Sequence, residues 1–386
     1  MSKWPIVKLG EVCQFINGDR GKNYPSGKDF VESGIPFINA GHLENRDIIF
    51  DDMNYITSEK YSKLGSGKIT AGDVLYCLRG SLGKHALVTI NKGAIASSLL
   101  ILRPKDRLNN RYLLYCLDSS SIKKQQDTAN NGSSQPNLSA ASVKNYAIPL
   151  PSLEEQKRIA AMLDKARSLI DLRKKQIAEM DALVKAKFIE MFGDPLINLK
   201  RWDTKQLKEL GEWASGSTPS RGESNYFTGN INWFTAGELN SLYLTDSIEK
   251  ITDEAVENSS TKIFKKGSMF IGMYDTAAFK MGVLQHDAAA NQACANICPN
   301  NIVNILWLYF ILTIMKPHFL ENRRGIRQKN LNLGMIKNFE IPLPPFDLQN
   351  EFARFVQQTD KSKLAKQKSL EQMETLYNAL MQQSFS

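Results

Sequence analysis

The stretch KNYAIPLPSLEEQ at residues 144–156 returns, with few changes, as KNFEIPLPPFDLQ at residues 337–349. Directly upstream, GSSQPNL at residues 132–138 matches GIRQKNL at residues 325–331 in the same register. Long matching segments at one constant offset indicate a duplicated domain, because arrays of short repeats have periods of 20–50 residues. We therefore expect two copies of one fold in this chain of 386 residues.

Weaker matches extend the duplication towards the start of each half. LGE at residues 9–11 recurs at residues 210–212, and IPFINAGHL at residues 35–43 recurs as INWFTAGEL at residues 231–239. Short β-like runs bounded by Gly, Pro and Asn alternate here with turns, and we expect strands at residues 35–38, 73–78 and 94–102. Apolar runs at residues 111–118 and 305–315 predict short core helices. The fold class expected for each half is α+β.

A long helix is predicted after each closing motif. In the first half, the prolines at residues 149 and 151 prevent an earlier start, and Ser152 is the expected N-cap, with Glu155 completing a capping box. The Gly-Asp-Pro sequence at residues 193–195 ends this helix. The expected organisation is a globular domain at residues 1–151, a central helix at 152–195, a second globular domain at 196–344 and a distal helix at 345–386.

Apolar residues recur along both helices at seven-residue spacing, which favours pairing with another helix. The alternative is that each helix only covers its own domain. The central stripe is Leu163, Ile170, Ile177 and Val184, broadened by Ala166, Met180 and Leu183; the distal stripe includes Val356, Leu370 and Tyr377 and is interrupted by Lys363.

The charge of the chain favours a polyanionic partner. The net charge is +9 and the isoelectric point about 9.1. Residues 1–152 hold 19 basic and 13 acidic side chains, whereas the helical segments are almost neutral. We therefore expect nucleic acid to contact the globular parts and proteins to contact the helices.

The sequence lacks the motifs of a self-sufficient enzyme. It has no phosphate-binding GxxxxGK[ST] loop and no dinucleotide fingerprint, and its four histidines have no metal-ligand spacing. The five scattered cysteines fit a reducing compartment, with Cys294 and Cys298 expected as buried thiols. No apolar stretch reaches the roughly 20 residues that cross a bilayer. These features predict a non-catalytic cytoplasmic protein without a membrane segment.

Three tracts resemble a known family. IPLPSLEEQKRI at residues 148–159 and FIEMFGDP at residues 188–195 resemble the central region of specificity subunits of type I restriction-modification enzymes. IPLPPFDLQ at residues 341–349 resembles the distal copy of that region, except that Leu348 stands where a glutamate is usual. The resemblance covers the whole chain in the order domain, helix, domain, helix.

This resemblance implies a function. The two globular parts would be target recognition domains, each reading one half of a bipartite, asymmetric site in double-stranded DNA. The two helices would pack antiparallel as a coiled-coil-like spacer and would dock two methyltransferase subunits, which restriction subunits join. S-adenosylmethionine, Mg and ATP would bind to those partners, and this chain would hold no cofactor or metal. The competing hypothesis is a coiled-coil scaffold protein that does not read DNA.

Candidate DNA-binding residues lie in two loops of each half. Arginine can pair with guanine, and asparagine or glutamine with adenine, in the major groove, whereas agreement between the halves favours phosphate contact or a structural turn. For the first of these loops the alternative is a plain surface hairpin. The candidates of the first half are Arg79, Ser81, Lys84, Gln135 and Asn137; those of the second are Tyr274, Thr276, Lys280, Arg324, Arg327, Gln328, Lys329 and Asn330.

Overall fold

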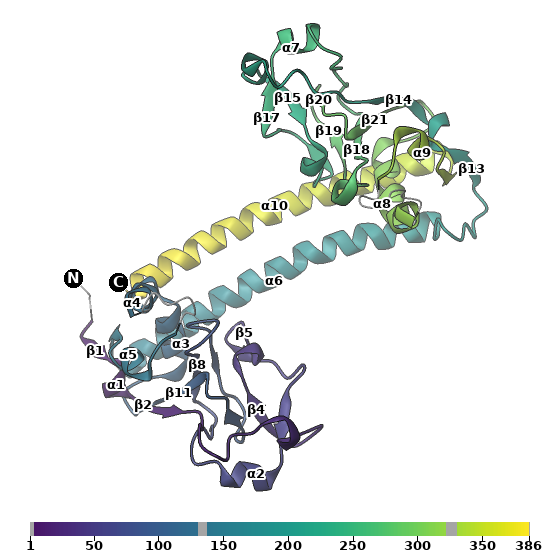
Figure 1. Ribbon diagram of the computed structural model, residues 1–386. Coiled ribbons are helices and arrows are strands. Elements are labelled where there is room, and N and C mark those ends of the chain that lie inside the picture. The colour runs from purple at the N-terminus through teal and green to yellow at the C-terminus, as the bar shows by residue number, and fades with distance from the viewer. Residues whose placement is uncertain (1–3, 130–136, 322–329, 386) are drawn as a thin grey trace. The chain divides into compact units, whose positions relative to one another are not determined.

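The computed structural model describes residues 4–129, 137–321 and 330–385, which form two compact units. Unit 1 comprises Met1–Lys174 and Lys368–Ser386, and unit 2 comprises Lys175–Gln367. Two long helices, α6 (Leu153–Phe192) and α10 (Phe346–Phe385), each contribute one segment to either unit (Figure 1). The compact units therefore cut through both helices, whereas the sequence analysis placed domain boundaries at the helix ends.

Unit 1 is built on two small sheets, the first antiparallel and the second mixed. The first has the order β2 (Cys13–Asn17), β11 (Leu99–Pro104), β8 (Val74–Cys77), β9 (His85–Leu87); the second has the order β10 (Ala94–Ile95), β4 (Ile35–Ile38), β7 (Asn54–Ile56), β3 (Phe30–Val31). Strand β1 (Ile6–Lys8) pairs with β12 (Ala147–Pro149), and β5 (Leu43–Glu44) with β6 (Asp47–Ile48). The helices are α1 (Leu9–Val12), α2 (Ser58–Lys63), α3 (Asn110–Asp118), α4 (Ser120–Ala129) and α5 (Ala140–Lys144).

Unit 2 repeats most of this strand order, with one strand more in the first sheet and one fewer in the second. One sheet runs β14 (Gly211–Ser215), β21 (Cys294–Pro299), β18 (Met269–Gly272), β19 (Met281–Leu284), β16 (Tyr243–Leu244), and the other runs β17 (Glu249–Ile251), β15 (Ile231–Phe234), β20 (Ala289–Ala290). Strand β13 (Asp203–Gln206) pairs with β22 (Glu340–Leu343), as β1 pairs with β12. The helices are α7 (Asp253–Glu257), α8 (Ile305–Glu321) and α9 (Leu333–Lys337). The duplication seen in the sequence is thus a duplication of α+β topology.

One expected strand proves to be two. Residues 94–102 divide into β10, which lies parallel to β4 in one sheet, and β11, which lies antiparallel between β2 and β8 in the other. A turn at residues 97–98 separates them. The run is apolar on both sides of Ser97 and Ser98 because the chain passes from one buried sheet to the other, and apolar character alone does not reveal this change of partner.

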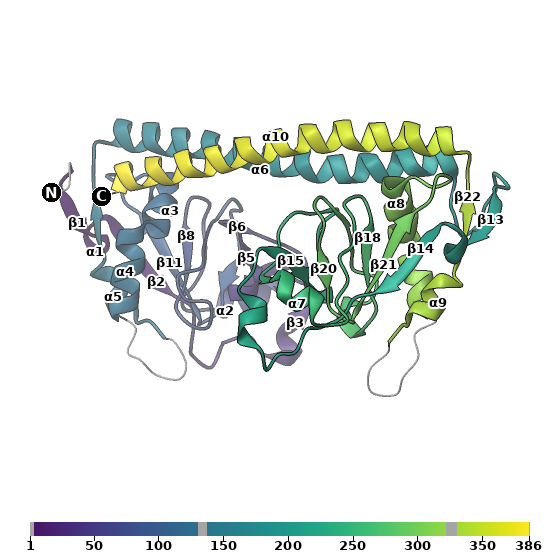
Figure 2. The ribbon, with the colours of Figure 1, turned by 90° about the horizontal axis from the view of Figure 1, so that it is seen from above.

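In each unit a short or medium helix lies between the strands and the paired segments of α6 and α10. Figure 2 shows α3 in this place in unit 1 and α8 in unit 2. Helix α8 extends beyond the expected residue 315 to Glu321 and contains Pro317. Its buried face packs with Phe188 of α6 and Phe352 of α10, whose rings are 5.3 Å apart. In unit 1, Ile159 and Leu163 occupy the positions that match Phe352 and Val356.

The glutamine shared by both closing motifs anchors the start of each long helix. Gln156 is fully buried; its Oε1 accepts from the backbone N–H of Asn109 at 2.8 Å, and its Nε2 donates to the carbonyls of Arg107 and Pro151 at 2.9 Å each. Ser152 caps the helix, since its Oγ accepts from the N–H of Glu155 at 3.4 Å. A side chain with one acceptor and two donors thus satisfies three backbone groups where the chain enters the helix.

Gln349 repeats this arrangement in unit 2. Its Oε1 accepts from the N–H of Asn304 at 2.8 Å, and its Nε2 donates to the carbonyls of Ile302 and Pro344 at 3.2 and 2.8 Å. Leu348, the departure noted in the sequence, is partly buried against the apolar core of the unit. The change from glutamate therefore leaves the anchoring glutamine in place.

The other end of each helix closes the core of the unit that it reaches. Phe385 at the end of α10 lies 5.3 Å from Tyr112 of α3, and Phe192 at the end of α6 lies 6.1 Å from Trp307 of α8. Tyr112 and Trp307 are the pair that the repeat aligns. Each recognition domain is therefore covered by the start of one long helix and the end of the other.

Candidate nucleic-acid interface

In unit 1, the loop after β8 forms a tight turn that exposes two of the candidate side chains. Cys77 accepts a backbone hydrogen bond from Gly83 at 3.1 Å and donates one to Lys84 at 2.8 Å. Gly80 and Gly83 have φ angles of 80° and 75°, a left-handed conformation that glycine adopts without a Cβ clash. Arg79 and Ser81 are exposed on this turn.

The second candidate loop of unit 1 ends against this turn. Asn137 forms an isolated antiparallel bridge with Arg79, and the N–H of the buried Leu138 donates to the carbonyl of Leu78 at 2.9 Å. Gln135 lies outside the described residues. Although the two loops are more than 50 positions apart in sequence, the structure joins them into one surface, which we call the unit 1 reading surface and define by residues 79–84 and 137–138.

Unit 2 builds the same surface from residues 274–280 and 330–331, which we call the unit 2 reading surface. The N–H of Leu331 donates to the carbonyl of Met273 at 2.8 Å, and the N–H of Asp275 donates to Oδ1 of Asn330 at 2.9 Å. Tyr274 and Thr276 are exposed. The candidates Arg324, Arg327, Gln328 and Lys329 lie outside the described residues.

A lysine at the end of each turn has a structural contact. Lys84 Nζ donates to the carbonyl of Ala40 at 3.5 Å, and Lys280 Nζ donates to the carbonyl of Gly237 at 3.3 Å. Both carbonyls belong to short 3₁₀ turns in the repeated Ala-Gly sequence, η2 (Ala40–His42) and η5 (Ala236–Glu238). Agreement between the halves at these positions therefore reflects at least a shared scaffold.

The residues expected to pair the helices differ in burial. In unit 1 Leu163 and Ile170 of α6 are buried, while Leu370 and Tyr377 of α10 are half-buried; in unit 2 Val184 and Val356 are buried and Ile177 is half-buried. The expectation for Leu183 is wrong: its side chain is 52% exposed. It lies one residue from the buried Val184, on the solvent side of the helix.

Charged pairs at the edges of this packing show that the segments run antiparallel. In unit 2 Lys363 Nζ lies 2.5 Å from Asp181, and Lys366 Nζ donates to Gln176 at 3.4 Å. In unit 1 Lys174 Nζ lies 2.8 Å from Glu374, close to the division between the units. As the residue number rises along α10, that of its partner falls along α6. Lys363, which interrupts the apolar stripe, is therefore an ion-pairing position.

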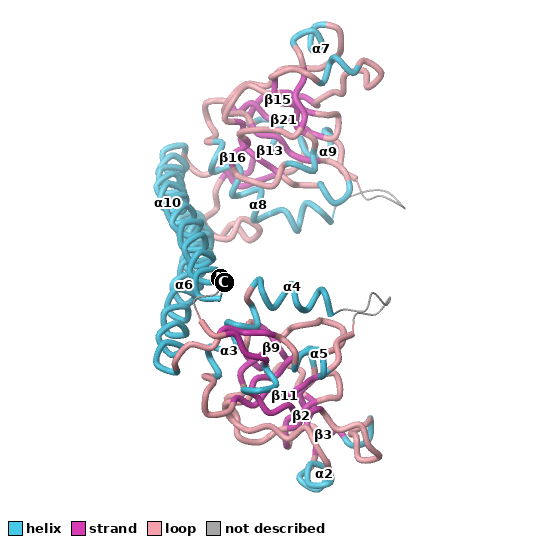
Figure 3. Tube along the Cα trace, turned by 90° about the vertical axis from the view of Figure 1, so that its left-hand side faces the viewer, coloured by secondary structure: helices cyan, strands magenta, loops and turns pink. Residues whose placement is uncertain are grey.

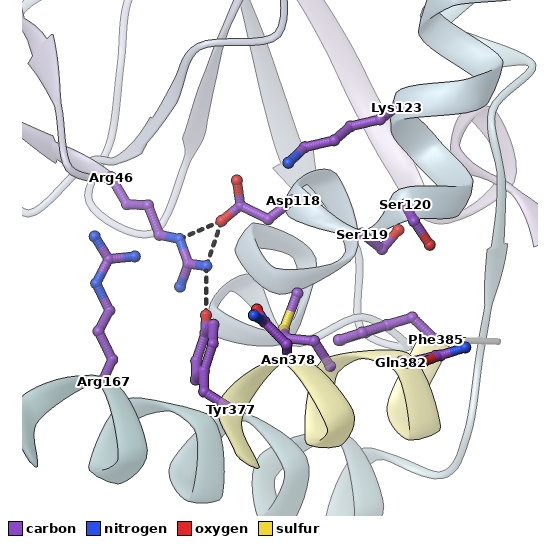
Figure 4. A pocket seen from close by; sticks show the side chains of 11 residues that line it. Arg46, Asp118, Ser119, Ser120, Lys123, Arg167, Tyr377, Asn378, Gln382 and Phe385 are labelled. Carbon is purple, nitrogen blue, oxygen red and sulfur yellow. Dashed lines mark hydrogen bonds and ion pairs between the residues drawn. The ribbon is translucent and has the colours of Figure 1, made fainter. Parts of the chain in front are cut away.

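A cavity of unit 1 contains an ion-pair network that the sequence analysis missed. Arg46 forms a salt bridge with Asp118 at the end of α3 and donates to the hydroxyl of Tyr377 on α10 at 3.2 Å (Figure 4). Its guanidinium carbon lies 4.0 Å from the ring centroid of Tyr115. Arg46 sits in the turn between β5 and β6 with a φ of 71°. No local pattern marks this residue, because Asp118 and Tyr377 are 72 and 331 positions away.

The cavity has a volume of about 640 Å³ and carries further basic groups, Lys123 and Arg167. Figure 3 shows α4, which carries Lys123, leading away from the end of α10. His85 lies beside the network, with its Nε2 3.7 Å from Asp118. Burial lowers the pKa of His85 below its usual range, although the charge of Asp118 opposes this effect. The network ties α10 to the sheet core of unit 1.

The corresponding region of unit 2 has a different chemistry. Tyr243 donates to Asp360 of α10 at 2.9 Å, and burial raises the pKa of Asp360. Apolar groups such as Phe310 and Ile314 line the neighbouring cavity of about 580 Å³. The attachment of helix to domain is thus repeated in position but not in residue type.

The described residues contain no cluster of three or more His, Cys, Asp or Glu side chains that could hold a metal ion. Within the same ranges, no helix is both long and apolar enough to cross a membrane. Cys294 is buried, as expected, and burial raises the pKa of its thiol to about 12. Cys298 is exposed, so the expectation of a buried thiol is wrong there: it lies near the end of β21, where the strand leaves the core.

Comparisons with known proteins agree with this duplicated architecture. The specificity subunit of the type I restriction enzyme MjaIX of Methanocaldococcus jannaschii is 22% identical to the chain, over 98% of the chain and 91% of that protein. The EcoR124I/EcoR124II specificity subunit of Escherichia coli is 26% identical over 58% of the chain and 57% of that protein. The crystal structure of an S subunit from M. genitalium has a TM-score of 0.60 at 16% identity and covers 100% of the chain and 96% of its own.

Two copies of one α+β domain, each followed by a long helix, make up the chain. The model of the type I restriction modification DNA specificity domain matches residues 1–182 and 200–375. The chain belongs to this family and is a specificity subunit of a type I restriction-modification system.

Proposed function

We propose that the chain reads a bipartite, asymmetric DNA target, one half-site per unit, and directs methyltransferase and restriction subunits to it. The observation that carries this proposal is the pair of reading surfaces. Both rest on the same backbone scaffold, yet unit 1 exposes Arg79 and Ser81 where unit 2 exposes Tyr274 and Thr276. Equal scaffolds place side chains equivalently, and different side chains read different base edges, so the two half-sites differ in sequence.

The partner subunits would supply the chemistry. Under this proposal the methyltransferase subunits bind S-adenosylmethionine, the restriction subunits use Mg and ATP, and this chain contributes binding free energy and selectivity. The helices offer a surface for these partners, since Leu183 and Leu376 occupy matching positions on α6 and α10 and are 52% and 60% exposed. Exposed leucines at matching positions of the repeat suit two copies of one partner.

The test is a methylome. The chain is co-expressed with its methyltransferase subunit in a host without DNA methylation, and modified adenines are mapped by single-molecule sequencing. A split motif that depends on this chain is expected. The variant Arg79→Ala should relax one position of one half-site, whereas the matched control Arg111→Ala, which removes an arginine of α3 paired with Asp164, should leave the motif unchanged.

A second outcome would favour the scaffold hypothesis. If the complex assembles with its full subunit content but methylates no defined motif, the chain holds partners together without reading DNA. Binding measured at several salt concentrations separates the two cases further. Each lysine or arginine that contacts phosphate steepens the fall of log K with log salt by about 0.9, and a pure scaffold gives no such dependence.

A further inference from the structure

The turns of the two reading surfaces are closed by equivalent backbone hydrogen bonds, but the unit 2 turn is one residue longer. Unit 1 places glycines, Gly80 and Gly83, at its two left-handed positions. The unit 2 turn also has two left-handed residues, Asp275 with φ 46° and Phe279 with φ 55°. L-residues other than asparagine and aspartate rarely adopt this conformation. The unit 2 turn is therefore strained at Phe279, and neighbouring contacts must hold it.

Two contacts hold this strained turn. At its start, Oδ1 of Asn330 accepts from the N–H of Asp275 at 2.9 Å. At its end, the side chain of Phe279 is 1% exposed and stacks on Phe319, with ring centroids 5.3 Å apart. Gly272 lets the turn approach closely, because a Cβ there would lie 2.2 Å from the carbonyl oxygen of Ala277. Strain held by specific contacts in this way is typical of functional positions.

The unit 2 turn presents an exposed carboxylate, that of Asp275. Its backbone N–H is bound to Asn330, and this contact leaves the carboxylate oxygens available to accept hydrogen bonds. A carboxylate at a DNA-binding surface is repelled by phosphate, so it is favourable only where it accepts from a base amino group. Cytosine offers only its N4 amino donor in the major groove, whereas adenine places the N7 acceptor beside its amino group, and guanine and thymine present keto oxygens.

We infer that Asp275 is a specificity-determining residue that selects a cytosine in the half-site read by unit 2, and that Asn330 is its positioning residue. This inference rests on the proposed function and deepens it. The carboxylate accepts from cytosine N4 and repels the keto oxygens of guanine and thymine. Asn330 orients the turn through the backbone of Asp275, so it acts without touching the base. Asparagine at the matching position in unit 1, Asn137, forms a backbone β-bridge with Arg79.

The experiment measures the methylome and the DNA affinity of the complex carrying Asp275→Asn. Asparagine keeps the size of the side chain but adds an amide donor and removes the charge. Discrimination for cytosine at one position of one half-site should fall about 5- to 150-fold, while affinity for non-specific DNA rises slightly. The other half-site, read by unit 1, is the internal control and should be unchanged.

Asn330 is tested with two variants. Asn330→Ala removes the acceptor and should relax the same half-site, whereas Asn330→Asp retains an oxygen at that place and should restore selectivity in part. A residue with a merely structural role would lower thermal stability in both variants without moving selectivity at the cytosine position. Purified complexes are also titrated with four oligonucleotides that differ only at that base, so a variant with weak methylation still gives a result.

The outcomes separate the inference from the proposed function. If the native complex shows a split motif and Asp275→Asn leaves every position of both half-sites unchanged, Asp275 does not determine specificity and the inference is overturned. If the native complex itself shows no sequence selectivity, the proposed function fails instead. Relaxation spread over both half-sites would also overturn the inference, since it would show general weakening of DNA binding.

Discussion

Replacing Gln349 by leucine removes the side chain that anchors the start of α10 in unit 2. Three backbone groups lose their partner: the N–H of Asn304 and the carbonyls of Ile302 and Pro344. A polar group left buried and unsatisfied costs about 1–3 kcal/mol. The bond to Ile302 is the longest of the three, at 3.2 Å, so its loss contributes least to the destabilisation. The free energy of unfolding of unit 2 should fall by about 3 kcal/mol, since the leucine recovers part of the loss through apolar burial.

The assay is thermal and urea unfolding together with hydrogen exchange of residues 346–367. A loss of about 3 kcal/mol lowers the midpoint of a domain of this size by about 6–12 °C. Gln357→Leu, at an exposed position of the same helix, is the matched control and should change stability by less than about 0.5 kcal/mol. Stability of Gln349→Leu within about 0.5 kcal/mol of the native value would refute the anchoring role.

Three other perturbations test the network and the helix packing. Arg46→Met leaves Asp118 without its main partner and should destabilise unit 1 by about 2 kcal/mol, less than for a fully buried pair because Asp118 is 32% exposed. Chemical unfolding measures this loss, with Arg111→Met as the control, which should lose less than about 1 kcal/mol. Equal losses in the two variants would contradict the importance of the Arg46–Asp118 pair. Because the pKa of His85 is lowered in the folded state, the unfolded state binds a proton at His85 more readily, so stability should decrease as the pH falls through about 6.5. Unfolding temperatures measured between pH 5 and 8 should decrease less in His85→Gln than in the native chain. Parallel curves of unfolding temperature against pH for the two proteins would exclude a contribution from His85. Phe188→Ala deletes a fully buried ring that packs against Phe352 and should lower the free energy of unfolding of unit 2 by about 3–5 kcal/mol. Denaturant titration measures this loss. A loss below about 1 kcal/mol would show that the helix segments do not pack as described.

The sequence was sufficient for the features that repeat. The matching motifs at residues 144–156 and 337–349 predicted duplication of an α+β fold, and the capping serine and the Gly-Asp-Pro stop bracketed α6 to within a few residues. These features depend on local backbone chemistry, which a single sequence displays. The sequence showed that Gln156 and Gln349 occupy matching positions. Their anchoring roles could not be predicted, because their partners are backbone groups of distant loops.

Features that depend on distant partners could not be predicted. Arg46 meets Asp118 and Tyr377 only because the fold brings β5, α3 and α10 together. The left-handed backbone of Asp275 is equally hidden, since the glycines that marked the same turn in unit 1 are absent. Leu183 was assigned to the apolar stripe next to Val184. Successive residues of a helix point about 100° apart, so Leu183 faces solvent although Val184 is buried. For the reading surfaces, the sequence supplied candidates in separate loops, and the structure joined them.

The division of the chain between the units has a consequence for its synthesis. Unit 2 is continuous, from Lys175 to Gln367, whereas unit 1 also needs Lys368–Ser386. At about 5–20 residues per second, the ribosome delivers that last segment on the order of 10–40 s after residue 174. Until Phe385 arrives to cover Tyr112, the domain that leaves the ribosome first keeps an open apolar face. The domain synthesised first is therefore the one completed last.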